Sequence, residues 1–136
     1  MKRSLFIACI IISLLSCINA RKLMNSNKVD RIYFGKRGGF TNIPMEYVLF
    51  ENRHLFKVRN DSLLKIHRIN RRQMETIDSL LVVSDFKMFS ISEYGNITYF
   101  IKVVRGDYEK EANWSDISEA DSLKALYNTL LTTIKK

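Results

Sequence analysis

The sequence has very little cysteine, proline and glycine, and the shortage of cysteine limits how the protein can be stabilised. Of the 136 residues, two are cysteine, one is proline and five are glycine. Cys9 lies within the apolar N-terminal run and Cys17 at its end, so the rest of the chain has no disulfide available. The hydrophobic fraction of 46% and the charged fraction of 26% are typical of a folded domain. We therefore expect a hydrophobic core to hold it together.

Motifs for catalysis and metal binding are also missing. The chain has no HExxH, no Gly-x-Ser-x-Gly and only two histidines, His54 and His67, which we interpret as ordinary surface or edge residues. Glu109 and Glu111 would share one face of a strand, but a solvated outer row explains them without a catalytic carboxylate pair. The sequence therefore predicts no catalytic residue, no metal, no cofactor and no small-molecule substrate. An enzyme with an unrecognised site is the alternative.

The N-terminal apolar run is too short to span a membrane. Lys2 and Arg3 precede the run from Leu5 to Leu15, whereas a spanning helix needs about 20 apolar residues. This pattern predicts a secretory signal peptide over residues 1–16.

The end of this run resembles a bacterial lipobox, Leu14-Leu15-Ser16-Cys17. The resemblance implies that Cys17 becomes the mature N-terminus and carries a diacylglyceryl group and a further acyl chain, which together give stable anchoring. The alternative is ordinary cleavage after Ala20, which would release a soluble secreted protein. Residues 18–30 are rich in asparagine and lack periodicity, so residues 17–30 are interpreted as the lipidated cysteine and a tether.

Positive charge is concentrated in the half of the chain next to this cysteine. Residues 17–75 contain 13 Lys and Arg against 5 Asp and Glu, whereas residues 76–136 contain 7 against 9. The basic residues of the densest stretch are Lys57, Arg59, Lys65, His67, Arg68, Arg71 and Arg72. They form either a solvated surface or, with Arg21 and Lys22, a patch that faces anionic lipid head groups. Nucleic acid is not an expected partner outside the cytoplasm.

Residues 31–136 are predicted to form a single α+β domain. Blocks of β-branched and aromatic residues predict five strands, over residues 30–34, 46–50, 54–58, 97–104 and 108–114. Residues 63–69 alternate loosely and are expected to lie extended along the sheet. In the connection at residues 51–53, Asn52 is expected to take the left-handed conformation.

Two amphipathic helices are predicted, one over residues 71–82 and one at the C-terminal end of the chain. Asn70 and Gln73 form a capping-box signal for the first helix, and Ser118 is the expected cap of the second. The predicted order is βββ-α-ββ-α, an antiparallel sheet of about five strands with both helices on one face.

A glycine-rich stretch, Gly35-Lys-Arg-Gly-Gly-Phe40, separates the first two predicted strands. Its glycines permit a turn or bulge. A phosphate-binding loop would need Ser or Thr after Gly-Lys and then a helix, and neither follows here. The stretch therefore predicts a structural turn.

The same stretch resembles a known family of inhibitors. Phe34-Gly-Lys-Arg-Gly-Gly-Phe-Thr41 is similar to the first hairpin of small bacterial lipoproteins of the Bacteroidota type, and of the emfourin family, which inhibits thermolysin-like metallopeptidases such as protealysin. The layout is similar over residues 31–134. The resemblance implies a partner-binding turn made by Gly38, Gly39, Phe40 and Thr41. Asn42 stands where the family pattern has a final glycine.

These observations predict a lipid-anchored protein of the bacterial cell envelope that acts as a non-catalytic binding module for another macromolecule. The alternative is an emfourin-like inhibitor whose partner is a metallopeptidase. In lipoproteins of the Bacteroidota type, which this sequence resembles, an acidic cluster after the cysteine tends to accompany export to the cell surface. No such cluster follows Cys17, so the resemblance implies an outer-membrane protein facing the periplasm. The membrane would then be a partner through the lipid anchor.

Overall fold

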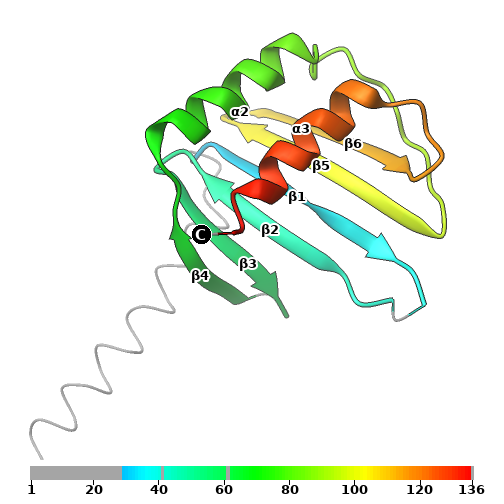
Figure 1. Ribbon diagram of the computed structural model, residues 1–136, viewed down its shortest axis with the longest axis horizontal. Coiled ribbons are helices and arrows are strands. Elements are labelled where there is room, and N and C mark those ends of the chain that lie inside the picture. Colours follow the sequence, from blue (N-terminus) through cyan, green and yellow to red (C-terminus); the bar gives the residue numbers. More distant parts are fainter. Residues whose placement is uncertain (1–28, 41, 61, 136) are drawn as a thin grey trace, which may run out of the picture.

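The computed structural model describes residues 29–40, 42–60 and 62–135. The predicted signal peptide, Cys17, nearly all of the predicted tether and Thr41 lie outside the described residues. The described part of the chain forms a six-stranded antiparallel sheet and two helices (Figure 1). The predicted α+β class is therefore confirmed.

Strands from both halves of the chain join in this one sheet. In chain order the strands are β1 (Arg31–Gly38), β2 (Met45–Phe50), β3 (His54–Arg59), β4 (Ser62–Arg68), β5 (Ile97–Arg105) and β6 (Tyr108–Ser115). Their spatial order is β4-β3-β2-β1-β5-β6. The glycine-containing strand β1 lies in the middle and pairs antiparallel with both β2 and β5.

The prediction of about five strands is wrong by one strand. The segment expected to lie extended along the sheet is β4, which pairs with β3 at the edge of the sheet. The register between these two strands shifts at Leu55/Phe56. Such a shift interrupts the two-residue periodicity of a strand, which explains the loose alternation in the sequence.

The two helices are α2 (Arg71–Val83) and α3 (Asp121–Thr132). The capping box of α2 is confirmed, because the Asn70 side chain accepts a hydrogen bond from the backbone N–H of Gln73 (2.8 Å), whose side chain accepts one from the Asn70 N–H (3.0 Å). The predicted cap of α3 is wrong. Ala120 is the N-cap residue, and Ser118 instead accepts a hydrogen bond from the backbone N–H of Ser115 (2.9 Å).

Both helices lie over the same side of the sheet in Figure 1, which we call the helix side. Their buried residues and the inward residues of the strands form a single hydrophobic core. Among its largest fully buried members are Phe34, Leu49, Leu55, Ile77, Ile101, Trp114, Leu123, Leu126 and Leu130. Trp114, expected to be a packing residue, lies in this core against Tyr99 and Tyr127.

The antiparallel pairing gives the sheet two distinct ends. We call the end where β1 begins the proximal end; Arg31 there pairs with Phe50 and Val104. We call the other end, where β1 finishes at Gly38, the distal end; Gly38 pairs with Ile97. The chain therefore enters the sheet at the proximal end, and the β1–β2 connection, which contains Phe40, lies at the distal end.

Candidate functional site

The predicted turn is shorter than the sequence suggested, because Gly35 through Gly38 belong to β1. Gly35 allows β1 and β2 to approach each other closely, since a Cβ at this position would lie 1.9 Å from the carbonyl oxygen of Met45. Gly38 and Gly39 form the turn with φ angles of +87° and +82°, in the region that favours glycine. Asn42, at the position of the family's final glycine, has a φ of +46°, which asparagine tolerates.

This turn is attached to a neighbouring loop. The backbone N–H of Gly39 donates to the carbonyl oxygen of Asn96 (2.7 Å), and the N–H of Asn42 donates to the oxygen of Gly39 (3.1 Å). A Cβ at Gly38 would lie 2.4 Å from the Asn96 oxygen, so glycine is required for this close contact. The turn is therefore held by backbone bonds as well as by its own conformation.

Large apolar side chains are exposed at the distal end. Phe40 is fully exposed and Ile43 is 67% exposed, both in the β1–β2 connection. Tyr94, before β5, and Ile117, after β6, are also mostly exposed. We call these four residues the apolar end. Such side chains at one place are characteristic of interaction surfaces.

The predicted basic patch does not form one continuous surface. Arg68, Arg71 and Arg72 lie at the proximal end, whereas Arg59 lies at the opposite end of β3. Lys57 pairs with Leu64, and Lys65 pairs with Phe56, the residue next to Lys57. Side chains alternate along a strand, so Lys57 and Lys65 point to opposite sides of the sheet.

The proximal members of this patch gather with Arg53, which sequence reasoning did not include. His54 pairs with Arg68 across the β3–β4 ladder. The pKa of His54 is lowered mainly by desolvation and further by the positive charges of Lys65, Arg68 and Arg53. We call Arg53, Arg68, Arg71 and Arg72 the proximal arginine cluster.

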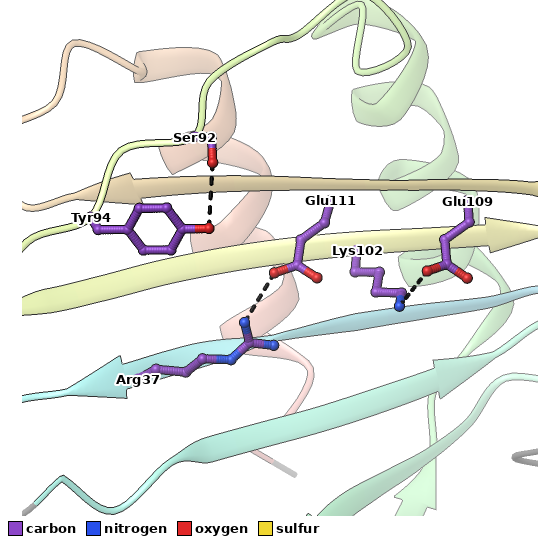
Figure 2. Close-up of polar contacts among 6 residues, drawn as sticks. All are labelled: Arg37, Ser92, Tyr94, Lys102, Glu109 and Glu111. Carbon is purple, nitrogen blue, oxygen red and sulfur yellow. Dashed lines mark hydrogen bonds and ion pairs between the residues drawn. The ribbon is translucent and has the colours of Figure 1, made fainter.

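The two glutamates of the predicted outer row each bind a cation, as Figure 2 shows. Glu111 on β6 accepts a hydrogen bond from Arg37 on β1 (3.0 Å), and Glu109 pairs with Lys102 on β5 (2.6 Å). These four side chains lie on the far side of the sheet, away from the helices. Two separate ion pairs are present instead of a carboxylate pair.

The far side also holds a half-buried carboxylate that sequence reasoning missed. Glu46 pairs with Gly35 in the β1–β2 ladder. Burial raises the pKa of Glu46, Arg37 lowers it, Glu111 raises it and Lys102 lowers it. No sequence signal could have placed Glu46 there, because its environment depends on the pairing of four strands.

Two cavities open on the proximal half of the domain. One of about 320 Å³ lies beside Asp30, Met74 and the ion pair of Arg105 with Asp78 (2.6 Å). Another of about 500 Å³ lies between the end of α2 and the β5–β6 hairpin, beside Val82, Phe86 and Tyr108. Within residues 29–40, 42–60 and 62–135, no group of three or more His, Cys, Asp or Glu is arranged to hold a metal ion.

Neither helix in the described part of the chain is long and apolar enough to cross a membrane. No protein-family model matches this chain, and no curated protein sequence matches it.

Proposed function

We propose that this protein is a lipid-anchored module of the bacterial cell envelope that binds another macromolecule through its apolar end. The observation that carries the proposal is the full exposure of Phe40 on a turn with a defined conformation. An exposed aromatic side chain has no role in the core, but aromatic residues are enriched among the residues that dominate binding energy.

The surroundings of Phe40 support a binding role. The Gly39 to Asn96 hydrogen bond holds the turn in place before any partner binds. A preorganised loop loses less conformational entropy on binding than a free one. Ile43, Tyr94 and Ile117 add apolar surface at the same end of the sheet.

The proposed location rests on the resemblance of residues 14–17 to a lipobox. Acylation of Cys17 would attach the domain to a membrane on the N-terminal side of β1, and we propose the periplasmic face of the outer membrane. Mass spectrometry of the protein from native membranes, with a Cys17→Ser control, tests this assignment. Acyl mass on an N-terminal Cys17 supports it. Cleavage after Ala20 without lipid would identify a soluble secreted protein instead.

The partner itself can be sought with a photo-crosslinking amino acid at position 40. The matched control places it at position 83, because Val83 is 80% exposed at the end of α2 and is not part of the apolar end. We expect a discrete crosslinked product from position 40 only. Equal crosslinking from both positions, or none from position 40, would contradict binding through the apolar end.

A second candidate function is inhibition of a metallopeptidase, as in the emfourin family. The exposure of Phe40 at a turn of fixed conformation favours this candidate, since a projecting side chain can insert into a peptidase site. Titration of a thermolysin-like peptidase should then abolish activity at a one-to-one ratio. Phe40→Ala should relieve the inhibition, whereas Val83→Ala should not. Full peptidase activity at excess protein would eliminate this candidate and leave the wider binding proposal intact.

A further inference from the structure

Three residues of the proximal arginine cluster form no ion pair with any residue that the structure describes. Among the described residues, Arg71 pairs with Glu75 (2.8 Å), while Arg53, Arg68 and Arg72 form no ion pair. In contrast, the cations on the far side, Arg37 and Lys102, are both paired with glutamates. Unpaired positive charge is therefore gathered at the proximal end near the β4 edge, although Lys36, Lys57, Arg59 and Lys65 also form no ion pair with a described residue.

Two of these arginines are in positions that do not suit the fold. Arg53 has a φ of +68°, a conformation that glycine and asparagine adopt more readily. Arg72 lies in the first turn of α2, where the helix dipole disfavours positive charge. Residues kept in unfavourable positions are often retained for function.

A series of hydrogen bonds connects this cluster to the point where the chain enters the sheet. The carbonyl oxygen of Asp30 accepts from the N–H of Glu51 (3.0 Å), which is two residues before Arg53. The oxygen of Arg53 then accepts from the N–H of Ile69 (2.9 Å), and Arg68 Nε donates to the oxygen of Asn52 (3.2 Å). The cluster and Asp30, the residue that precedes β1, therefore lie at the same end of the domain.

We propose that the proximal arginine cluster binds the anionic head groups of the membrane that holds the lipid anchor, so that the apolar end points away from that membrane. This inference rests on the proposed anchoring at Cys17. An anionic lipid surface fits because Arg68 and Arg72 are exposed, Arg53 is half-buried, and none of the three is paired with a described acidic residue. They also lie at the end of the sheet where the chain enters β1. An acidic protein would offer the same charge, but nothing would place it at this end.

The proximal arginine cluster and the apolar end are separated by the length of β1. Eight residues of extended chain span roughly 26 Å, which is about three Debye lengths at physiological salt. A partner at Phe40 is thus beyond the screened field of the head groups. The domain would hold its apolar end clear of the lipid surface.

Vesicle co-sedimentation of residues 17–136 with Cys17→Ser tests the proposal without the lipid anchor. Every residue of the hydrophobic core lies at position 32 or beyond, so this chain keeps the whole core. We expect binding to vesicles containing phosphatidylglycerol, a decrease with added salt, and no binding to phosphatidylcholine alone. The cluster variant Arg53→Asn/Arg68→Gln/Arg72→Gln should bind roughly a hundredfold more weakly, at roughly fivefold per charge.

The control variant Lys36→Gln/Lys57→Gln/Arg59→Gln removes the same charge away from the proximal end and should retain most of the binding. Equal losses in both variants would show attraction by net charge alone and overturn the proposed orientation. Vesicle binding that does not decrease with added salt, or does not require anionic lipid, would show that the contact is not electrostatic and overturn the proposal. The absence of vesicle binding, with capture of an acidic protein by the cluster, would assign the cluster to that protein instead. Each of these results leaves the mass spectrometric test of Cys17 unaffected.

Orientation can be measured directly, because Cys17→Ser leaves residues 17–136 without cysteine. A fluorophore on Asn52→Cys, at the proximal end, should be quenched by nitroxide-labelled lipid head groups. The same fluorophore on Ser62→Cys, at the start of β4 and the opposite end, should not be quenched. Equal quenching of the two labels, or stronger quenching at position 62, would overturn the proposal.

Discussion

The guanidinium group of Arg37 lies over the ring of Phe100, with its central carbon 3.9 Å from the ring centre. The same group binds Glu111 through Nη1 at 3.0 Å. Phe100 is only 1% exposed although it points away from the helices. Arg37 therefore contributes to covering an aromatic ring on the far side and joins β1 to β6 across β5.

This stacking predicts that Arg37→Lys destabilises the domain although the charge is kept. Lysine can still pair with Glu111, but it lacks the flat group that covers the ring. We expect the free energy of unfolding to fall by about 0.5–1 kcal/mol in urea denaturation. Lys102→Arg is the control, since the Lys102–Glu109 ion pair is half-exposed and should tolerate the exchange within about 0.5 kcal/mol. Equal effects of the two substitutions would contradict a special role for stacking.

Alanine substitutions at Gly35 and Gly106 distinguish the stability cost of a steric clash from the cost of an unfavourable backbone conformation. Gly35→Ala would place a Cβ 1.9 Å from the Met45 oxygen in the centre of the sheet, so we expect a loss of about 3 kcal/mol or more. Gly106→Ala meets no atom within 4 Å but has a φ of +56°, so its cost should be about 1 kcal/mol. Urea denaturation measures both, and a smaller loss for Gly35→Ala would show that β1 and β2 can separate locally.

Glu46 should make the domain less stable as the pH rises. Its pKa in the folded protein is above the ordinary value of 4.5, chiefly because of burial, so the folded state binds this proton more tightly than the unfolded state does. The stabilisation is complete below pH 4.5 and is lost as the pH rises through the folded pKa.

Glu46→Gln should therefore raise the stability at neutral pH and remove this part of the pH dependence. The control is Glu119→Gln, an exposed site with the same change in charge. Thermal unfolding across the acidic range measures both variants. A pH profile of Glu46→Gln parallel to that of the unmodified protein would refute the assignment.

The capping box of α2 predicts a specific cost for Asn70→Ala. The substitution removes the acceptor for the Gln73 N–H, and we expect a loss of about 1 kcal/mol in urea denaturation. Asn70→Asp keeps an acceptor at this position and should retain most of the stability. If both variants lose the same amount, the cap is not the cause.

Two phenylalanines six positions apart should behave in opposite ways. Phe34 is fully buried in the core, so Phe34→Ala should cost about 3–5 kcal/mol. Phe40 is fully exposed, so Phe40→Ala should change stability by no more than about 0.5 kcal/mol while it abolishes binding to a partner or inhibition of a peptidase. A large loss of stability in Phe40→Ala would mean that this side chain packs against the protein.

Local sequence patterns predicted the elements better than the arrangement of charged groups. The capping box of α2 and the β5–β6 hairpin depend on residues close in sequence, so composition and spacing were sufficient. The edge strand β4 was not counted because a register shift disturbs its alternation. Ser118 was expected to cap α3, but it bonds instead within the preceding turn and to Glu93.

The candidate sites could be predicted only in part, because they depend on strand pairing between residues far apart in the sequence. The family resemblance implied that Phe40 contacts a partner, and the structure exposes this side chain fully. Asn52 was expected to take the left-handed conformation, but Arg53 takes it, and Asn52 instead accepts a hydrogen bond from the His54 N–H (3.1 Å). The strand order places the predicted basic residues in separate groups, which their spacing along the sequence could not show.

The central position of β1 has a mechanical consequence for an anchored protein. A pull between Cys17 and a partner held at Phe40 would act along this strand, which is hydrogen-bonded to β2 on one side and β5 on the other. The bonds of both ladders would then share the load in shear, whereas a pull across an edge strand breaks them one after another. If the proposed anchor and partner are present, tension between them would therefore be carried by two ladders at once.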